Sequence, residues 1–353
     1  MRVAFVSFET IHHRDTETKR RLQTILTLLQ NAGHDVHVYC ARFWEGDCST
    51  FERNGITYHG LGSDLEARYA FVARLPVALA SLRPDVVHTI PEPPGQVLAA
   101  NWGATLARAP LVLEWCGTEE LPANRVMRWA LPKPDCIITP SELVTTWVME
   151  RGVDEHGVDV VPNPIDVDRI RETPVGEDVD VIYSRRLDEG ANLESLFLAL
   201  AEYRDRDWTA TVLGDGPERD TYERLASDLR IENRVTFAGN CSLEERIAAY
   251  RGAHVFAQTA EYCVFPSEML WAIASGCVGI VEYHVNSSAH ELVEGWDRGF
   301  RTTSEEELAD AIVEAGDLER REFDEAFDEY DKDAVLEQYL TTYERLQESS
   351  GVL

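Results

Sequence analysis

The chain has 353 residues, of which 44% are hydrophobic, and at roughly 150 residues per domain this is enough for two cores. It carries 63 Asp and Glu against 33 Lys and Arg, a formal net charge of −30. The long-range field of this charge repels phosphates, which argues against nucleic acid and a general anionic surface as partners.

The acidic composition includes only three lysines, Lys19, Lys133 and Lys332. Such a composition resembles that of proteins from salt-loving organisms, halophilic archaea among them, in which concentrated salt screens self-repulsion. An ordinary acidic cytosolic protein is the alternative interpretation.

The seven cysteines form no CxxC pair and no metal spacing with histidine. Buried free thiols in a reducing compartment are therefore expected. The apolar start MRVAFVSF is shorter than a signal peptide and is interpreted as a first strand. No apolar run approaches the ~20 residues of a membrane helix, so a cytoplasmic protein is expected.

Short apolar runs alternate with helical patterns along the first half, which is typical of βαβ units and a parallel sheet. A polar loop, Phe8 to Asp15, is expected after the first strand. The expected strands are Arg2–Ser7, Asp35–Cys40, Ile56–His59, Asp85–His88, Leu111–Glu114, Cys136–Thr139 and Val158–Val161. The expected helices are Thr16–Asn31, Leu65–Leu82 with a kink at Pro76, one from Gln96 and one capped by Ser141.

The sequence Pro-Asn-Pro at 162–164 interrupts regular structure and is interpreted as an interdomain linker. The expected strands beyond it are Val179–Tyr183, Trp208–Leu213, Arg234–Phe237, Val255–Ala257 and Cys277–Val281. The expected helices are Asn192–Tyr203, one ending at Leu229, Leu243–Tyr250, Phe265–Ser275, one starting near Ser288 and an acidic helical region from Ser304.

The alternation predicts an α/β protein of two doubly wound, Rossmann-like domains facing each other across a cleft. The first domain is expected at 1–165 and the second at 166–330. Residues 331–353 are expected to form a C-terminal helix, with packing back towards the first domain as one option.

Polar residues gather after the two apolar strands of the stretch 255–295. They are Glu261, Glu268, Asn286, Ser287, Ser288, His290 and Glu291. The carboxyl ends of parallel strands share one sheet edge, where ligands bind in open α/β sheets. This stretch is therefore the first candidate for a binding site.

Two further motifs follow strands at the same predicted edge. The turn Gly214-Asp215-Gly216-Pro217 permits positive φ and close approach of a ligand or of the other domain, although a plain tight turn also explains it. Neither GxGxxG nor GxxxxGK[ST] occurs, which argues against the dinucleotide fingerprint and the P-loop. We interpret Arg186 as a phosphate ligand and its neighbour Arg185 as a surface ion-pair partner.

The motifs, taken in order, resemble those of family 4 glycosyltransferases over nearly the whole chain. The second half carries VPNPIDVDRI (161–170), VIYSRRLDEGANLESL (181–196), VLGDGPER (212–219) and RVTFAG (234–239), and the first half carries MRVAFVSFETIHH, NAGHDVHVYC (31–40), RPDVVHT (83–89) and DCIITPSELV (135–144). The resemblance implies the GT-B pair of domains, a nucleotide-diphosphate sugar as co-substrate and retention of anomeric configuration. It also implies that the catalytic step needs no cofactor and no metal.

The resemblance assigns roles to residues of the second half. Arg186 matches the arginine that contacts the donor diphosphate, and Gly214, Asp215 and Gly216 match the turn near the donor sugar. Ser287, Ser288, Ala289 and His290 match the loop whose backbone N–H groups bind phosphate, and Glu291 matches the acidic residue opening the next helix. An arginine together with such N–H groups would stabilise the charge on a departing diphosphate.

The chain also departs from the family pattern. Ala191 stands where the family usually has a lysine, and Cys263 and Trp271 stand at the positions of its two glutamates. We interpret Glu268 as the substitute that contacts a ribose or sugar hydroxyl, and Glu261 as the second choice. Simple helix capping is the alternative role for Glu268.

Acceptor-side residues are expected in the first half. His12 and His13 are candidates for a base or for holding an acceptor hydroxyl, with Asp15 beside them. His88, Glu114 and Trp115 end later strands that are expected at the same edge. A structural role as satisfied polar groups is the alternative for each.

Two cationic clusters stand out in so acidic a chain. One is Lys19-Arg20-Arg21, and the other is Arg125, Arg128 and Lys133, interleaved with Met127, Trp129 and Leu131. They are either contacts with lipid headgroups at the cytoplasmic face of a membrane or ordinary helix faces with ion pairs.

The sequence thus predicts a retaining glycosyltransferase that moves a hexosyl-type sugar to a lipid-linked, glycan or small-molecule acceptor. The partners expected are the nucleotide sugar and an acceptor, with no nucleic acid, and the oligomeric state stays open. An alternative is a catalytically inactive member that binds nucleotide sugar or acts as a scaffold, motivated by Ala191, Cys263 and Trp271. A sugar epimerase or phosphorylase is a third, weaker alternative.

Overall fold

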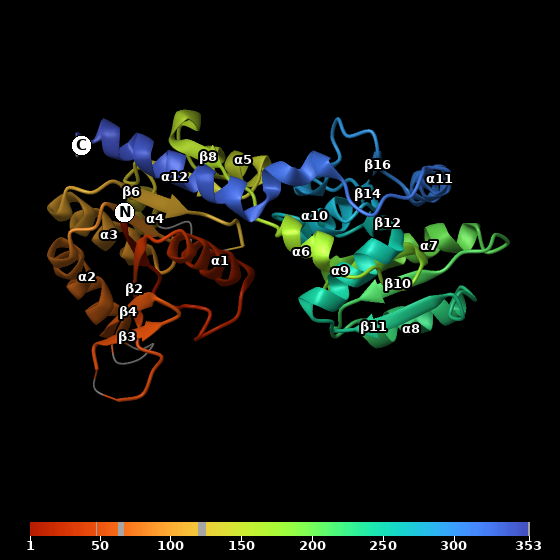
Figure 1. Cartoon of the computed structure of the whole chain (residues 1–353), viewed down its shortest axis with the longest axis horizontal. Coiled ribbons are helices and arrows are strands. Elements are labelled where there is room, and N and C mark those ends of the chain that lie inside the picture. The colour runs from red at the N-terminus through yellow and green to blue at the C-terminus, as the bar shows by residue number, and fades with distance from the viewer. Residues whose placement is uncertain (47, 63–66, 119–124, 352–353) are drawn as a thin grey trace. The chain divides into compact units, whose positions relative to one another are not determined.

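The computed structural model describes residues 1–46, 48–62, 67–118 and 125–351 (Figure 1). It divides into two compact units, Met1–Pro162 with Asp333–Leu353, and Asn163–Lys332. Each unit is a sheet of mainly parallel strands covered by helices on both faces, which confirms the predicted α/β class with two Rossmann-like domains. The division falls in the predicted Pro-Asn-Pro linker and again after Lys332, the first residue of the last helix. None of the described helices is long and apolar enough to span a bilayer.

The first unit is built on an eight-stranded sheet with the order β3-β4-β2-β1-β5-β6-β7-β8. All neighbouring strands are parallel except the antiparallel pair β3–β4. The strands are β1 (Arg2–Val6), β2 (Asp35–Ala41), β3 (Thr50–Arg53), β4 (Ile56–Gly62), β5 (Val86–Thr89), β6 (Leu111–Glu114), β7 (Cys136–Thr139) and β8 (Val158–Val160).

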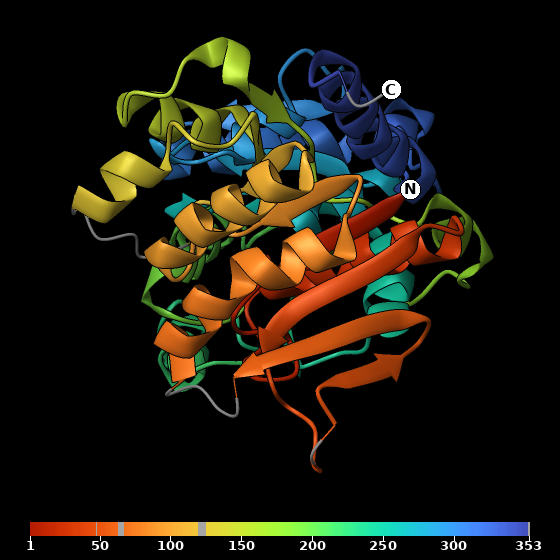
Figure 2. The same cartoon turned by 90° about the vertical axis from the view of Figure 1, so that its left-hand side faces the viewer.

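Alternation along β1 divides the first unit's core between the two faces of its sheet, because successive strand side chains point to opposite sides. Val3 and Phe5 pack with α1 (Glu17–Asn31) and with the last helix, α12 (Lys332–Ser349). Ala4 and Val6 pack with α2 (Arg68–Leu82) and α3 (Pro94–Ala107). Figure 2 shows α2 and α3 side by side over the sheet, with α4 (Arg125–Ala130) beyond α3; α5 (Glu142–Glu150) precedes β8.

Close packing of α2 on α3 depends on Gly103. A Cβ at this position would lie 2.6 Å from Cδ1 of Leu79 and 3.1 Å from Cα of Pro76. Pro76 itself lies within α2. The predicted start of this helix at Leu65 lies outside the described residues.

The second unit is built on a six-stranded, all-parallel sheet with the order β11-β10-β9-β12-β14-β16. A second, two-stranded sheet pairs β13 with β15. The strands are β9 (Val179–Ser184), β10 (Ala210–Leu213), β11 (Val235–Gly239), β12 (Ala253–Gln258), β13 (Tyr262–Cys263), β14 (Val278–Glu282), β15 (Asn286–Ser287) and β16 (Gly299–Thr302).

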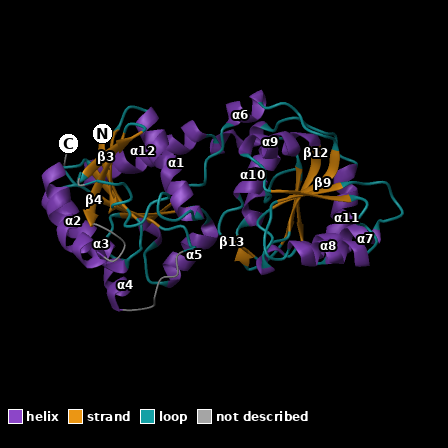
Figure 3. Ribbon diagram, turned by 90° about the horizontal axis from the view of Figure 1, so that it is seen from below, coloured by secondary structure: helices purple, strands orange, loops and turns teal. Residues whose placement is uncertain are grey.

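Helices cover both faces of the second sheet (Figure 3). One core holds Val181 and Val255 with α7 (Leu193–Glu202), α8 (Arg219–Asp228) and α11 (Glu305–Gly316). The other holds Ile182 and Phe256 with α6 (Val167–Glu172), α9 (Leu243–Gly252) and α10 (Ser267–Ala274).

Some elements differ from the sequence-based expectation. The strands β3, β13 and β15 were not predicted, because four exposed residues and two-residue pairings leave no periodic pattern. The helix expected after Ser288 is a single 3₁₀ turn, Ala289–Leu292. The other 3₁₀ segments are Glu155–Gly157, Glu189–Ala191 and Glu325–Tyr330.

Candidate functional site

The strand order of the second unit identifies the sheet edge at which a ligand would bind. The chain runs outward from β9 through β10 and β11, then returns to β12 on the other side of β9. Open α/β sheets bind ligands beyond the carboxyl ends of the two strands at such a reversal, which here are β9 and β12. Arg185 and Arg186 follow β9, and Glu261 follows β12.

The loops after β9 and β12 are joined by hydrogen bonds. Arg185 donates from Nη1 to the carbonyl of Tyr262 at 3.0 Å, and the N–H of Glu261 donates to the carbonyl of Gly190 at 3.3 Å. Asn192 adds a bond from Nδ2 to the carbonyl of Thr259 at 3.0 Å. The loops therefore form one connected rim at the switch point.

The two arginines of this rim are placed differently. The side chain of Arg185 is 23% exposed and is held by Tyr262, with Asp188 4.0 Å away. The side chain of Arg186 is 73% exposed, and its Nε lies 4.0 Å from Oδ2 of Asp188. Arg185 is thus a structural tie, and Arg186 presents its guanidinium to solvent at the rim, where it can meet an anion.

Contacts with a neighbouring loop of the same chain require glycine at two positions after β10. Gly214 has φ +117°, and a Cβ there would lie 2.0 Å from the carbonyl oxygen of Arg185. A Cβ on Gly216 would lie 2.1 Å from the carbonyl oxygen of Leu187. Asp215 between them accepts the N–H of Gly216 and lies 3.8 Å from Arg219. The segment that closely approaches these glycines is therefore the loop after β9 that contains Arg185 and Arg186, which we call the arginine loop. This contact fixes the arginine loop beside β10.

The predicted phosphate loop is tied to the loop after β12. The N–H of Ser287 donates to the carbonyl of His284 at 3.0 Å, and the N–H of Ser288 donates to the carbonyl of Cys263 at 2.8 Å. Ser288 also donates from Oγ to the carbonyl of Val264. Both amides thus already have acceptors, Ser287 within its own loop and Ser288 at the end of β13. That these two amides bind phosphate stays a prediction.

The remaining residues of this loop form the 3₁₀ turn. Ala289 and His290 open it, at a position where backbone N–H groups have no intrahelical acceptor. Nδ1 of His290 lies 3.0 Å from the carbonyl of Ser287, and its ring packs against Tyr283. Glu291 follows in the same turn, its N–H donating to the carbonyl of Ser288.

Glu268 lies in the first turn of α10 and ends a chain of polar side chains. Its Oε2 accepts from the hydroxyl of Tyr250 at 2.5 Å and lies 3.2 Å from Nε of Arg246. The oxygen of Tyr250 lies 2.8 Å from Oγ of Ser184, the last residue of β9. Since the tyrosine proton goes to the carboxylate, Ser184 donates to the tyrosine. Glu268 is thus connected to the residue that precedes the arginine loop, and Tyr250 and Arg246 are members that the sequence reasoning missed.

The positions that depart from the family pattern hold core side chains. Ala191 is fully buried, Cys263 is 9% exposed and Trp271 packs against the core that contains Met269. Glu261 is exposed at the rim. None of these three positions therefore places a charged side chain at the rim.

A further carboxylate at the edge was not predicted. Glu282 ends β14, is 9% exposed, and accepts from Oγ of Ser195 at 3.1 Å and from Nδ2 of Asn192 at 3.2 Å. Nε2 of His284 lies 3.8 Å from it. The sequence feature that could have predicted this site is a charged residue at the end of an otherwise apolar strand. Within the described ranges, no three His, Cys, Asp or Glu side chains cluster as metal ligands.

In the first unit, His13 is held by its own loop. Nδ1 of His13 lies 3.1 Å from the backbone N–H of Thr10 and accepts from it, which places the proton of the neutral ring on Nε2. The ring of His12 packs on Phe43 with centroids 4.4 Å apart. Burial lowers the pKa of both histidines. Asp15 is exposed and paired with Arg20 at 2.6 Å. His12 thus fits the role of a neutral base better than His13, whose Nδ1 is already engaged.

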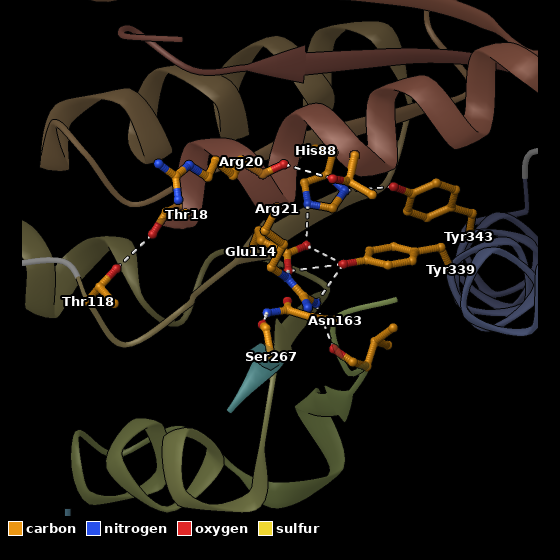
Figure 4. Close-up of polar contacts among 12 residues, drawn as sticks. Thr18, Arg20, Arg21, His88, Glu114, Thr118, Asn163, Ser267, Tyr339 and Tyr343 are labelled. Carbon is orange, nitrogen blue, oxygen red and sulfur yellow. Dashed lines mark hydrogen bonds and ion pairs between the residues drawn. The ribbon is translucent and has the colours of Figure 1, made fainter. Parts of the chain in front are cut away.

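His88 and Glu114 belong to a buried network instead of an open surface (Figure 4). Glu114 lies 2.6 Å from Nε of Arg21 and 3.0 Å from Nε2 of His88, and it accepts from the hydroxyl of Tyr339 at 3.1 Å. Nδ1 of His88 lies 2.7 Å from the hydroxyl of Tyr343. The network ties α1, β5 and β6 to α12, so the alternative of a structural role is the one that the geometry supports for both residues.

The pKa of Glu114 reflects this network. Burial alone disfavours its charged form, but attraction to Arg21 and the hydrogen bond from His88 outweigh burial and lower the pKa to about 2. Trp115, the next residue, is also buried, with the guanidinium of Arg151 5.2 Å from its ring. A contact of these three residues with an acceptor stays a prediction.

The first cationic cluster is not a lipid-binding surface. Lys19 is 6% exposed and pairs with Glu9 at 2.6 Å, and Arg21 is 5% exposed and pairs with Glu114. Two of its three cations are therefore used inside the unit. In the second cluster Arg128 and Lys133 are exposed. The side chain of Arg125, the third cation of this cluster, is not among the side chains that the structure describes.

Comparison with known proteins places both halves of the chain in glycosyltransferase families. The model described as Glycosyltransferase Family 4 matches residues 18–169, and that described as Glycosyl transferases group 1 matches residues 165–334. The 2-deoxystreptamine glucosyltransferase of Streptomyces kanamyceticus is 30% identical over 132 residues, which cover 32% of this chain and 34% of that relative. The match thus spans about a third of the relative's length.

Two solved structures share the fold over the full length. HepE of Anabaena, in complex with UDP, has a TM-score of 0.73 and 18% identity, covering 98% of this chain and 100% of that one. A glycosyltransferase of Rickettsia africae has a TM-score of 0.75 and 15% identity, covering 98% of both chains. The two consecutive glycosyltransferase models together cover residues 18–334, and the two units have the GT-B fold of these solved glycosyltransferases.

Proposed function

We propose that the protein transfers a sugar from a nucleotide-diphosphate sugar to an acceptor hydroxyl with retention of anomeric configuration. The observation that carries the proposal is the exposed Arg186 guanidinium at the switch point of the second unit. HepE of Anabaena has been solved with UDP and with UDP-glucose, which supports a uridine donor as the first to test.

Arg186 stabilises the charge that develops on the departing diphosphate. A guanidinium pairs with phosphate oxygens through two parallel hydrogen bonds and keeps its charge at any physiological pH. The N–H groups of Ala289 and His290 add donors to the same rim, in place of those of Ser287 and Ser288. The proposed chemistry needs no metal, because these protein groups supply the electrostatic stabilisation.

Glu268 acts as a positioning residue in this proposal. Its carboxylate accepts a hydrogen bond from the hydroxyl of Tyr250 and pairs with the guanidinium of Arg246, which connects α10 to α9. Through Tyr250 and Ser184 it is also connected to the end of β9. Glu261, exposed at the rim, is then the carboxylate that contacts a donor hydroxyl. This reverses the order that the sequence suggested for the two glutamates.

The acceptor is proposed to be a lipid-linked saccharide, another glycan or a small molecule, bound by the first unit near His12. Burial lowers the pKa of His12, which favours the neutral ring that can accept a hydrogen bond from a hydroxyl. The acidic composition supports a cytoplasmic setting at high salt as part of the proposal.

A second candidate is an inactive member that binds a nucleotide sugar without transferring it. It is favoured by one observation: buried Ala191 and Cys263 and partly buried Trp271 stand in the positions of the family lysine and glutamates. In that case the rim binds the diphosphate, and no carboxylate is placed for the donor sugar.

The two candidates are separated by measuring binding and turnover on the same variants. Calorimetry with UDP-, GDP- and ADP-sugars gives binding, and release of nucleoside diphosphate in the presence of an acceptor panel gives turnover. Arg186→Ala is expected to weaken binding and to reduce turnover by about two orders of magnitude or more, whereas Arg224→Ala, an exposed arginine on α8, leaves both unchanged.

Binding by the wild type without release across all donors and acceptors would favour the inactive candidate. Unchanged binding and turnover in a folded Arg186→Ala protein would refute the role of Arg186.

A further inference from the structure

Three helices of the first unit form an apolar surface that nothing in the described chain covers. Of the six described large apolar side chains that are more than 60% exposed, five lie on α2, α3 and α4. These five are Tyr69 (82%), Val77 (68%), Trp102 (66%), Leu106 (64%) and Trp129 (64%). We call them the α2–α4 surface; Figure 2 shows these helices on the face of the unit turned to the viewer.

The spacing within α2 and within α3 places these side chains on one outer face of each helix. Tyr69 and Val77 lie two turns apart on α2, with exposed Ala73 between them, and Trp102 and Leu106 lie one turn apart on α3. Residues at this spacing share one helix face. Gly103 lets α2 and α3 pack closely, so their outer faces lie side by side.

Charge on these helices is opposite to that of the whole chain. The sequences of α2, α3 and α4 contain no Asp or Glu, although the chain has 63 of them. Arg68, Arg74 and Arg128 are exposed on the same helices. In the described part of the chain no carboxylate pairs with any of these three arginines. An acid-free, cationic and apolar face in a protein of net charge −30 points to an anionic partner with an apolar interior.

A hollow beside the apolar side chains carries two further cations. It is lined by Asn101 and Thr105 of α3, by Arg108 and by Lys133. Asp135 also lines it, and its Oδ2 accepts the N–H of Leu111. Cations beside exposed tryptophans are the arrangement that suits a lipid headgroup above acyl chains.

We propose that the α2–α4 surface binds the protein to a bilayer that contains anionic lipid. Tyr69, Trp102, Leu106 and Trp129 enter the interfacial region, and Arg68 and Arg128 contact phosphate groups. The net charge does not prevent this, since at about 0.15 M salt only charges within ~8 Å of the membrane are felt. Use of a lipid-linked acceptor rests on the proposed function, whereas binding of the bilayer does not.

Vesicle flotation tests the proposal without any turnover. The full chain is floated with phosphatidylcholine vesicles, with or without about 30 mol % phosphatidylglycerol, at about 0.15 M and about 2 M KCl. We expect the protein to float with the anionic vesicles. In the lower salt, binding to neutral vesicles should be at least about tenfold weaker than binding to anionic vesicles, and in the higher salt this preference for anionic vesicles should disappear. Failure to float with either vesicle in both salts overturns the proposal.

Variants locate the binding surface. The triple variant Trp102→Ser, Leu106→Ser, Trp129→Ser is expected to bind at least about tenfold more weakly, and Arg68→Ser with Arg128→Ser to lose the preference for anionic vesicles. The matched controls Met149→Ser with Val175→Ser, and Arg204→Ser with Arg224→Ser, change exposed side chains elsewhere and are expected to float like the wild type.

Full flotation of the folded triple variant overturns the assignment. Light scattering adds a second readout. If the wild type is a dimer, the triple variant is a monomer and neither protein floats, the surface is a contact between two copies of the chain and the membrane proposal is overturned. Release of nucleoside diphosphate with a water-soluble acceptor is expected to be unchanged in the triple variant. Failure of the membrane proposal is thereby distinguished from failure of the proposed function.

Discussion

Nε of Arg21 lies 2.6 Å from Oε1 of Glu114, and both side chains are almost completely buried. The pair connects the first helix of the chain to the end of β6. Nη2 of Arg21 also donates to the hydroxyl of Tyr339 at 2.7 Å and to the carbonyl of Val161. The charged centre of the first unit is thus completed by a residue more than 300 positions away in α12.

Breaking this pair is expected to destabilise the first unit strongly. Arg21→Met should lower the free energy of unfolding by about 3–5 kcal/mol, because it leaves the Glu114 carboxylate buried without its main countercharge. Denaturant unfolding followed by circular dichroism measures the change. Arg20→Met is the matched control, since Arg20 pairs with Asp15 at the surface and should cost no more than about 1 kcal/mol. Equal losses in the two variants would contradict the assignment.

His59 is expected to make stability depend on pH. Burial, and then repulsion from His37, lower its pKa to about 4, whereas an unfolded histidine titrates near about 6.5. Because the folded pKa is the lower one, this contribution is fully present above pH ~6.5 and is lost as the pH falls towards 4. Thermal unfolding between pH 7 and 4 should show a steeper decline for the wild type than for His59→Phe, which cannot take up the proton. Parallel curves would refute the role of His59.

Gly214 is expected to tolerate no side chain. Gly214→Ala combines a φ of +117° with a Cβ 2.0 Å from the carbonyl oxygen of Arg185, and should lower the free energy of unfolding by about 2 kcal/mol or more. Gly316→Ala is the control, because a Cβ at Gly316 meets nothing within 4 Å and its effect should stay within about 1 kcal/mol. A Gly214→Ala protein as stable as the wild type would show that the loop can relax.

Tyr250→Phe should reveal whether Glu268 acts through position or by contact with the donor. The change removes the hydroxyl that links Glu268 to Ser184 and leaves the carboxylate paired with Arg246. If Glu268 positions the arginine loop, Tyr250→Phe and Glu268→Gln should lower kcat by similar factors with little change in donor KM. Steady-state kinetics over a donor series measures both. A large KM effect for Glu268→Gln alone would indicate direct donor contact.

Salt is expected to stabilise the protein. A net charge of −30 makes self-repulsion large at low ionic strength, and the Debye length falls from about 10 Å at 0.1 M to about 3 Å at 1 M salt. The midpoint of thermal unfolding should therefore rise as KCl increases to about 2 M. Potassium chloride is used in place of sulfate so that exclusion of the salt from the surface does not dominate. A midpoint independent of KCl would argue against adaptation to high salt.

Local patterns were sufficient for most of the elements. The apolar runs at Val179–Tyr183 and Cys277–Val281 are buried parallel strands because both of their faces are covered, and buried strands read as continuous apolar segments. Ser141 caps its helix through a bond from the N–H of Val144. The position of Arg186 beyond β9 follows from the same reasoning, since every parallel strand ends at one edge of the sheet.

What the sequence by itself determined is the alternation of strands and helices, the two-unit organisation and the edge at which the polar loops lie. Only the tertiary structure decided which polar residues are available there. Glu268 and Glu114 looked alike as carboxylates near strand ends, yet one is tied to Tyr250 and Arg246 and the other is enclosed with Arg21 and His88. The physical reason is that a charged side chain is buried only where distant segments supply its partners, and no local pattern records those partners.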